Sequence, residues 1–311
     1  MPWDDKIGLR LKLKDLLILR AVIDAGGIGK AAHRLNYSQP AVSKAIASLE
    51  RTVGRRLFER GRGGIELTPY GSALLKCGVA VFDDLRNGIN EIDALADPTE
   101  GEVRITCSEP VSAGIVSAVV NKFVRQYPRV TFNIYAREPP LVYRDLDGRN
   151  VDFVITQTNT PIDEEHMQQE VLYDEPVVVV AGARHPLARK RRIKLSDLAD
   201  AAWALPPRDS FISSVITGAF RASGLAAPRI VMRGSTQTRL TLLADGRLLT
   251  IVPATMLKVG ASHGIIKVLP VELPGNRRPV SLVTLKNRAL SPVAQLFIEH
   301  VRSMAKTMAG S

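Results

Sequence analysis

Polar and turn-forming residues open a segment that has the periodicity of a helix, in the stretch SQPAVSKAIASLE. Ser38 is a preferred N-cap residue, and Pro40 then falls in the first helical turn, where its missing N–H has no intrahelical partner to lose. Short or flexible hydrogen-bonding side chains at the tip of a helix can reach base edges and phosphates of duplex DNA. The groups placed to do so are Gln39, Ser43 and Lys44.

A DNA-reading helix also needs an apolar side that holds it in place. Val42, Ile46 and Leu49 recur at spacings of four and three, so they form one stripe away from the polar tip. A short helical stretch, KAAHRL, precedes the segment, and its paired alanines allow two helices to cross closely. This pattern is typical of a helix-turn-helix. The alternative is a small helical bundle with an ordinary polar face.

The residues after this helix have the pattern of a β-hairpin. LFER and IELT are short apolar strand patterns on either side of GRGG, a flexible turn. Arg60 and Arg62 lie beside this turn, where their guanidinium groups could contact DNA phosphates. A hairpin wing added to a helix-turn-helix predicts a winged-helix domain, which we place at residues 9–67.

A long amphipathic helix is predicted over residues 68–96, where Thr68 and Pro69 repeat the pattern of cap and proline. Apolar positions then alternate in steps of three and four, as in a coiled coil. We predict that this apolar seam pairs two chains, because a lone amphipathic rod leaves it uncovered. The alternative is that the seam packs on its own chain. The predicted dimer contacts are Leu75, Phe82, Leu85, Ile89 and Ile92.

The last two hundred residues alternate short β-rich runs, such as EVRITCS and VDFVITQ, with helical stretches. This alternation predicts an α/β fold with mostly parallel sheets. Ligands in such folds bind past the carboxyl ends of strands, often at helix N-termini. Polar groups at four strand-to-helix turns could each be simple caps, but together they predict a pocket for a small polar or anionic ligand. The polar groups are Ser108, Gln157, Thr158, Arg208, Ser210, Ser235 and Thr236, and the apolar Phe211, next to Ser210, is predicted to line the same pocket.

The charge of the chain favours anionic partners. Its formal net charge is +11, and the basic density is highest in residues 1–80, which hold 14 Lys and Arg against 7 Asp and Glu. We find no apolar run of membrane-spanning length and no signal-peptide pattern. The two cysteines, Cys77 and Cys107, are too few for a disulfide framework. We therefore expect a cytoplasmic protein.

Motifs of known chemistry do not support an enzyme. GIGKAA, at residues 27–32, matches a dinucleotide-binding loop, but the residues before it have helical periodicity where that loop requires a strand. The sequence has no G-x-S-x-G, H-E-x-x-H or Walker A motif, and its five histidines show no spacing typical of metal ligands. We predict that the protein is not an enzyme and needs no cofactor or metal.

Residues 13–71 resemble the DNA-binding domain of the bacterial LysR-type transcriptional regulators. The matching elements are AAHRLNYSQPAVSKAIASLE and, after it, VGRRLFER and IELTPYG. The chain departs from the family at Gly27, where a serine is usual, and at Gly63, where a second wing arginine is usual. The resemblance implies that Gln39, Pro40, Ser43 and Lys44, at the start of the helix that follows Ser38, face the major groove. It also implies that the residues nearer the DNA backbone are Arg34, Arg60, Arg62 and Thr68.

The resemblance extends more weakly to the C-terminal part, where ADGRLLTIVP is similar to a family segment. It implies a periplasmic-binding-protein-like effector domain of two α/β subdomains, with the ligand between them and crossover strands near 171–176 and 271–276. Arg137 lies in a loop that is unusual for the family and could set the identity of the ligand. The implied bounds are a hinge at 97–101, an effector domain at 102–311, subdomain I at 102–173 and 275–311, and subdomain II at 174–274.

By analogy with the family, we expect a homodimer that assembles into a homotetramer on promoter DNA and can contact RNA polymerase. Arg208 and the basic C-terminal part favour a carboxylate as the small ligand. Two other functions remain open. A solute-binding α/β module with a helical appendage would predict a secretion signal or a nucleophile with its base. A structural nucleoid protein would bind DNA without a cleft or a sequence preference.

Overall fold

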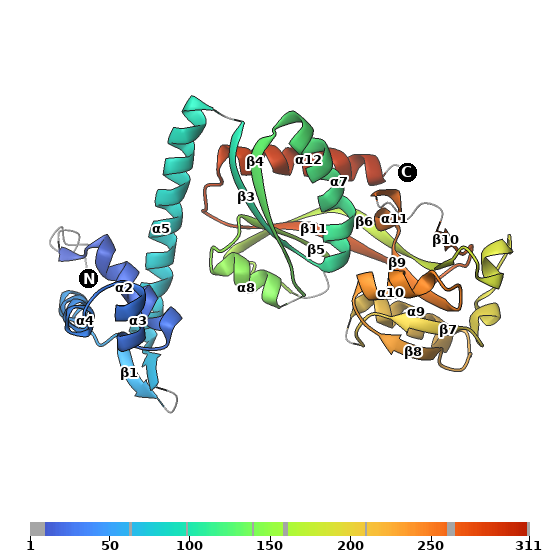
Figure 1. Cartoon of the computed structure of the whole chain (residues 1–311), viewed down its shortest axis with the longest axis horizontal. Helices are drawn as coiled ribbons and strands as arrows, with labels where there is room; N and C mark the ends of the chain where they lie inside the picture. The colour runs from blue at the N-terminus through green and yellow to red at the C-terminus, as the bar shows by residue number, and fades with distance from the viewer. Residues whose placement is uncertain are drawn as a thin grey trace. The chain divides into compact units, whose positions relative to one another are not determined.

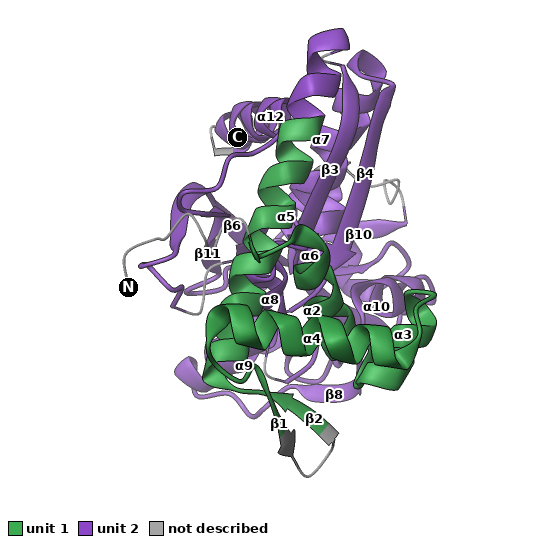
Figure 2. Ribbon diagram, turned by 90° about the vertical axis from the view of Figure 1, so that its left-hand side faces the viewer, with its two compact units in different colours: residues 1–89 green, residues 90–311 purple. Residues whose placement is uncertain are grey.

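The computed structural model describes residues 10–61, 64–97, 99–138, 140–157, 161–208, 210–259 and 265–309. They belong to two compact units, which Figure 2 shows in different colours: unit 1 ends at Ile89 and unit 2 begins at Asn90. Within these residues, no helix combines the length and the apolar composition needed to cross a membrane.

The described residues of unit 1 form three short helices, a hairpin and the first part of a long helix (Figure 1). The apolar stripe predicted for the third helix, α4, is buried, because Val42 and Ile46 pack against Ile18 and Val22 of α2. The two strands of the hairpin pair antiparallel, from Phe58 opposite Leu67 to Gly61 opposite Gly64. The elements are α2 (Leu13–Ala25), α3 (Ile28–Arg34), α4 (Gln39–Val53), β1 (Phe58–Gly61), β2 (Gly64–Leu67) and α5 (Pro69–Ala96).

Local sequence explains where α4 begins and ends. The Ser38 side chain accepts a hydrogen bond from the backbone N–H of Ala41 at 3.3 Å, as expected of an N-cap, and Pro40 lies in the first turn. Gly54 ends the helix with a φ of 71°, a left-handed conformation that glycine adopts without steric cost. The helix therefore begins with the predicted polar tip.

Helix α5 is one continuous element of 28 residues, or about 42 Å at 1.5 Å per residue. Leu75 is partly buried against the cluster of Leu19, Leu49 and Leu57 in unit 1. Further along the helix, the seam residues Leu85, Ile89 and Ile92 are 46%, 58% and 66% exposed. The start of the predicted seam thus packs on its own chain, whereas these later positions are open to a partner.

Unit 2 is built on a nine-stranded sheet in the order β4-β3-β5-β11-β6-β9-β7-β8, with β10 paired to β6. Among the described residues, the two largest hydrophobic clusters of this unit lie in two different parts of the sheet. We call the part around β3, β4 and β5 lobe I and the part around β7, β8 and β9 lobe II. The strands are β3 (Glu100–Cys107), β4 (Arg129–Ala136), β5 (Phe153–Gln157), β6 (Met167–Gly182), β7 (Ala202–Leu205), β8 (Arg229–Arg233), β9 (Leu248–Pro253), β10 (Ile266–Val268) and β11 (Arg277–Leu285).

Helices cover both lobes. In lobe I, Phe123 of α7 and Phe297 of α12 are fully buried against the sheet, and in lobe II Phe220 of α9 packs edge-on to Trp203. The helices of lobe I are α6 (Glu109–Val111), the π-turn η1 (Ser112–Val116), α7 (Ser117–Gln126), α8 (Leu141–Asp147) and α12 (Pro292–Ala309). Those of lobe II are η2 (Pro186–Arg189), η3 (Leu195–Leu198), α9 (Phe211–Ala222), α10 (Thr236–Leu243) and α11 (Ala254–Val259).

The prediction of mostly parallel sheets is wrong for the middle of the sheet. The outer strands pair parallel, β3 with β4 and β5, and β7 with β8 and β9. Strands β6 and β11 pair antiparallel with each other, with β5 and with β9. The reason is that β6 extends from lobe I into lobe II and β11 returns beside it. Near this crossing the N–H of Val177 donates to the carbonyl of Asn276 at 2.8 Å.

Candidate functional site

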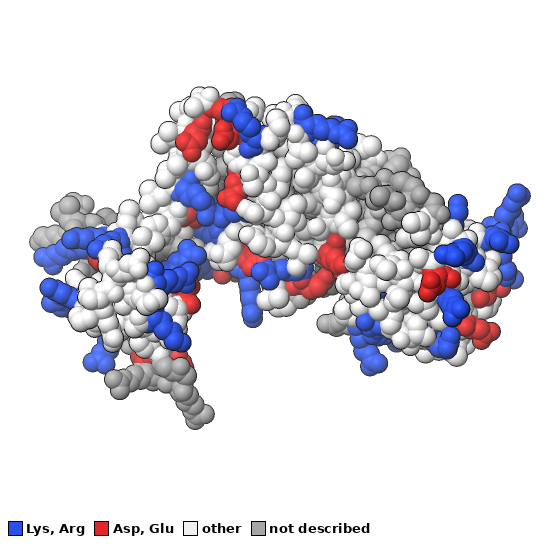
Figure 3. All heavy atoms as spheres, in the orientation of Figure 1, with Lys and Arg blue, Asp and Glu red and all other residues white. Residues whose placement is uncertain are grey.

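The exposed tip of α4 is the candidate nucleic-acid surface of unit 1. Gln39, Pro40, Ser43 and Lys44 are all exposed and lie off the buried stripe of Val42, Ile46 and Leu49. Blue Lys and Arg side chains are frequent on the face of unit 1 that Figure 3 shows. A short polar tip that includes Lys44 and is held by a buried apolar side has the chemistry needed to approach duplex DNA.

The four residues predicted nearer the DNA backbone differ in their surroundings. Arg34 is exposed in the last turn of α3. The backbone of Arg60 lies in β1, and Arg62 falls outside the described residues. Thr68 differs from the prediction, because its side chain is buried. Its hydroxyl donates to the Arg56 carbonyl at 2.7 Å and accepts from the Gly71 N–H at 3.1 Å, so it fixes the hairpin to α5.

A cleft of about 520 Å³ opens between the two lobes of unit 2. Both lobes contribute to it, through the ends of β3 and β5 in lobe I and the starts of α9 and α10 in lobe II. Its lining residues are Ser108, Glu109, Pro110, Glu138, Thr156, Gln157, Pro206, Pro207, Ser210, Phe211, Ile212, Gly234, Ser235, Thr236 and Arg239. The cleft therefore lies where strands end and helices begin, as ligand sites in α/β folds do.

Most of the predicted ligand residues meet in this cleft, and two do not. The guanidinium of Arg137 pairs instead with Asp145, at 2.7 Å. Arg208 is exposed and is not among the residues that line the cleft. Thr158 falls outside the described residues. The predicted residues that the structure brings together are Ser108, Gln157, Ser210, Phe211, Ser235 and Thr236.

Two of the serines act as helix caps. The hydroxyl of Ser210 accepts from the Ser213 N–H at 3.1 Å, and that of Ser235 accepts from the Thr238 N–H at 3.2 Å. Ser108 occupies the same kind of position before α6, but its side chain makes no capping bond. Its hydroxyl is therefore available to a ligand.

Four polar atoms on the cleft walls are buried without a hydrogen-bond partner among the described residues. They belong to side chains that are at most 9% exposed. Leaving such a group unsatisfied costs about 1–3 kcal/mol, so each favours a water molecule or a ligand that can bond to it. Every one can donate a hydrogen bond, which favours a ligand rich in acceptors. The atoms are Ser108 Oγ, Thr156 Oγ1, Gln157 Nε2 and Arg239 Nε.

Arg239 is a charged member of the cleft that the sequence alone did not reveal. Its guanidinium is almost fully buried and donates to Thr250 Oγ1 at 2.6 Å, the Ile251 carbonyl at 2.9 Å and Thr236 Oγ1 at 3.0 Å. Burial lowers the pKa of Arg239 to about 10, while the nearby Glu109 opposes that change, so the group stays protonated at neutral pH. Its position one turn after Thr236 in RGSTQTR was the available signal.

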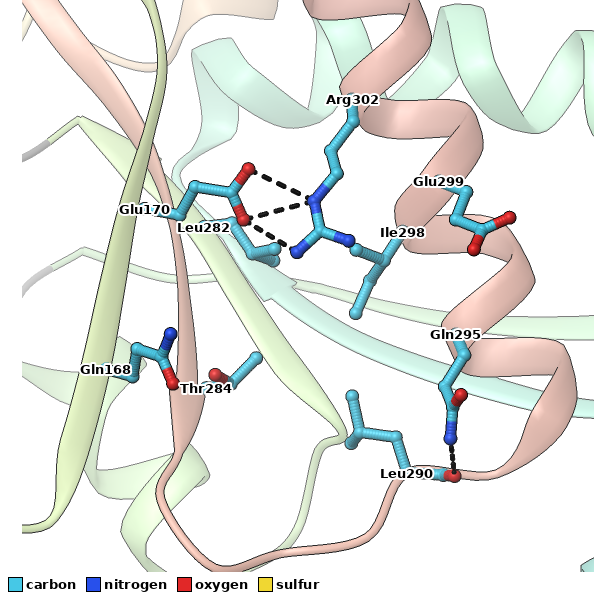
Figure 4. Close-up of a pocket in the computed structure, with 9 residues that line it drawn as sticks. All are labelled: Gln168, Glu170, Leu282, Thr284, Leu290, Gln295, Ile298, Glu299 and Arg302. Carbon is cyan, nitrogen blue, oxygen red and sulfur yellow. Dashed lines mark hydrogen bonds and ion pairs between the residues drawn. The ribbon is translucent and has the colours of Figure 1, made fainter.

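A second, smaller hollow of about 250 Å³ lies on lobe I, between α12 and strands β6 and β11 (Figure 4). Arg302 and Glu170 face each other there, with Nη2 and Oε2 2.7 Å apart, and Gln295 donates to the Leu290 carbonyl at 2.8 Å. These polar groups already bind one another. The cleft between the lobes, with its unpartnered donors, is therefore the stronger candidate ligand site.

One group of side chains could approach a cation. Asp163, Glu165 and His166 bring their ligand atoms within 4.8 Å of one another, a proximity that the histidine spacing did not indicate. All three are exposed, and His166 Nδ1 already lies 2.8 Å from an Asp163 oxygen. Exposed acidic groups often gather without an ion, so this cluster carries no metal assignment.

Comparison with known families assigns both units. Residues 13–72 match the bacterial regulatory helix-turn-helix proteins of the lysR family, and residues 96–306 match the LysR substrate binding domain. The chain belongs to the LysR family of transcriptional regulators. The family matches and the structure together confirm the predicted helix-turn-helix domain with its hairpin and the predicted α/β effector domain.

Known LysR-family regulators match over nearly the whole chain. The regulator GbpR of Azospirillum brasilense is 26% identical over 300 residues, which cover 96% of this chain and 88% of GbpR. The activator LysR of Escherichia coli K12 is 28% identical over 295 residues, covering 94% and 93% of the two chains.

Solved structures of the family share the fold. The crystal structure of CbnR aligns with a TM-score of 0.63 at 22% identity, covering 95% of this chain and 99% of CbnR. Full-length CbnR bound to its target DNA aligns with a TM-score of 0.63, also at 22% identity, over 94% of this chain and 99% of CbnR. A single-residue variant of full-length OxyR from Pseudomonas aeruginosa aligns with a TM-score of 0.64 at 19% identity, covering 95% of each chain.

Proposed function

We propose that this LysR-family regulator reads promoter DNA with the tip of α4 and is controlled by a small anionic metabolite bound between the lobes of unit 2. The observation that carries the DNA part is the exposure of four polar or first-turn residues over a fully apolar, buried back of the same helix. In this proposal Gln39, Ser43 and Lys44 contact base edges in the major groove, beside Pro40, and Arg34 and Arg60 contact phosphates.

The ligand part rests on the four unpartnered donors of the cleft and on the buried guanidinium of Arg239. We infer that a carboxylate, which carries acceptors and a negative charge, is the ligand class that satisfies them. Because both lobes line the cleft, such a ligand contacts both of them and so influences their separation. The ligand can regulate DNA binding only if it binds one arrangement of the lobes better than another.

The exposed seam of α5 supports self-association. Leu85, Ile89 and Ile92 offer an apolar edge that a second α5 would cover. A dimer presents two copies of α4 to two half-sites, and assembly of dimers into a tetramer, contact with RNA polymerase and a cytoplasmic location complete the proposal. The relatives GbpR and LysR are transcriptional regulators, which favours this proposal over a solute-binding module with a helical appendage.

Binding to DNA selected by the protein from a random pool tests the proposal. We expect Gln39→Ala and Lys44→Ala each to weaken binding to the selected sequence by about 1–3 kcal/mol, because each removes a side chain from the reading surface. The matched control is Lys122→Ala, which removes an exposed lysine from α7 in lobe I.

The measurement is fluorescence anisotropy of selected and random DNA over a series of salt concentrations. Both affinities should fall with salt, and the selected DNA should bind far more tightly than random DNA. Equal binding of both DNAs, or losses in Lys44→Ala no larger than in Lys122→Ala, would contradict the assignment of α4.

A further inference from the structure

Glu109, the first residue of α6 in lobe I, reaches across the cleft to lobe II. Its two carboxylate oxygens accept hydrogen bonds from the backbone N–H of Thr236 at 3.0 and 3.2 Å. Thr236 is the first residue of α10. One side chain therefore joins the two walls of the candidate ligand site directly.

The place that this carboxylate occupies is suited to an anion. The first N–H groups of a helix have no intrahelical partner, and the helix dipole favours negative charge beside them. The buried guanidinium of Arg239, one turn further along α10, bonds to the side chain of the same Thr236 at 3.0 Å. The positive charge of Arg239 adds to the attraction. In turn, the charge of Glu109 partly offsets the lowering of the Arg239 pKa by burial.

The surroundings of Glu109 are those of a ligand site and not of an ordinary inter-lobe contact. Ser108 Oγ, Thr156 Oγ1 and Gln157 Nε2 lie on the lobe I wall of the same cleft, buried and without partners among the described residues. On the lobe II wall, Arg239 Nε is likewise buried without a hydrogen-bond partner among the described residues. An acceptor-rich molecule bound to these donors would reach the start of α10, where Glu109 now lies.

We propose that Glu109 is an internal anion that occupies the carboxylate position of the cleft in the ligand-free protein, and that the effector is a small carboxylate which displaces it. This inference rests on the proposed function of the cleft as the effector site. Displacement replaces a bond within the protein by a bond to the ligand at the same N–H. The regulator then has a bridge between its lobes in both states, and the identity of the bridging carboxylate distinguishes them.

The proposal predicts an effect opposite to that of an ordinary binding residue. Removing a side chain that binds the ligand weakens ligand binding. Removing a carboxylate that competes with the ligand frees the position and strengthens the binding of other carboxylates. Acetate, which is a carboxylate small enough to enter the space that a truncated glutamate leaves, can serve as the probe.

The experiment compares the full-length wild type with Glu109→Ala in sodium acetate and in sodium chloride of equal ionic strength. Hydrogen exchange reports on the Thr236 N–H. We expect exchange at Thr236 to be at least tenfold faster in Glu109→Ala than in wild type in chloride, and to slow again in acetate. The wild type should show the same exchange in both salts. Glu272→Ala, which removes an exposed carboxylate that does not line the cleft, should behave as wild type.

An exchange rate in Glu109→Ala that does not respond to acetate, or one that equals the wild-type rate in chloride, overturns the proposal. If Glu109→Ala does not fold, Glu109→Gln keeps the size and removes the charge. It should then show faster Thr236 exchange that acetate slows in part, and the same two failures overturn the proposal.

A screen of small carboxylates for their effect on DNA binding separates this inference from the proposed function. Acetate rescue without any carboxylate effect on DNA binding leaves the role of Glu109 standing and removes the effector role. A carboxylate effect that is equally strong in wild type and Glu109→Ala supports the effector role and removes the competition.

Discussion

Three serines at strand-to-helix turns show what a single residue type can and cannot indicate. Ser108, Ser210 and Ser235 each precede a helix, so the sequence could predict where they lie. Ser210 and Ser235 use their hydroxyls as caps, whereas the Ser108 hydroxyl has no hydrogen-bond partner in the part of the chain that the structure describes. This difference depends on which residues become neighbours in the folded chain, and these cannot be predicted from the sequence alone. The pairing of Arg137 with Asp145 has the same origin.

A buried carboxylate at the crossing between the lobes, Glu175, should make the stability of the protein depend on pH. Glu175 of β6 is 1% exposed and accepts hydrogen bonds from the Tyr173 hydroxyl at 3.0 Å and the Thr255 N–H at 3.2 Å. Burial raises the pKa of Glu175, although these hydrogen bonds oppose the effect. As pH rises above the ordinary carboxyl value, the unfolded chain loses its proton first, so the contribution of Glu175 to stability falls.

Replacement of Glu175 by Gln should remove this pH dependence. We expect the free energy of unfolding of Glu175→Gln, relative to wild type, to increase between pH 5 and pH 8. The increase is about 1.4 kcal/mol for each tenfold difference in proton affinity between the folded and unfolded states. Urea unfolding followed by the fluorescence of the buried Trp203 measures it, and parallel pH profiles of the two proteins would refute the prediction.

At the scale of elements, the junction between the hairpin and α5 depends on one close approach. A Cβ added to Gly71 would lie 2.1 Å from the carbonyl oxygen of Leu57 and 2.7 Å from a methyl carbon of Leu67. Apart from its chain neighbours and the backbone of its own helix, no atom of the described residues lies within 4 Å of such a Cβ on Gly88, further along the same helix. The first glycine is required by packing, whereas the second only lowers helix propensity.

Alanine at these two positions should therefore change stability in opposite directions. We expect Gly71→Ala to destabilise unit 1 by about 1–3 kcal/mol through overpacking, and Gly88→Ala to stabilise the helix by up to about 1 kcal/mol. Thermal unfolding followed by circular dichroism compares the two variants with wild type. Gly71→Ala melting at or above the temperature of Gly88→Ala would contradict the close packing of this junction.

The elements themselves could largely be predicted because their signals are local. The cap and proline at Ser38 and Pro40 identify the start of α4, and apolar periodicity identifies α5. The length and direction of β6 could not be predicted, because its Met167–Gly182 span joins two lobes and its partners lie elsewhere in the sequence. For the same reason, the buried Arg239 and the bridging Glu109 became evident only once both lobes were assembled around the cleft.

The whole molecule carries two candidate sites, which belong to different compact units. Unit 1 carries the exposed tip of α4, and unit 2 carries the cleft with its unpartnered donors. One helix tip can contact only a few bases, which is too few to select one promoter among many sites. Selective binding therefore requires two copies of α4, one from each of two chains. The exposed Ile89 and Ile92 of α5 are the residues through which a second chain would be held.

A footprint of the wild type and of Ile89→Glu on the selected DNA tests this central claim most directly. Ile89→Glu places a charge in the exposed apolar seam, so it should reduce the measured mass in solution to that of one chain while unit 1 stays folded. The wild type should protect two half-sites about one helical turn, or a multiple of it, apart, and Ile89→Glu should protect neither half-site at concentrations that saturate the wild type. Two fully protected half-sites with a monomeric Ile89→Glu, or an unchanged dimeric mass, would contradict the account.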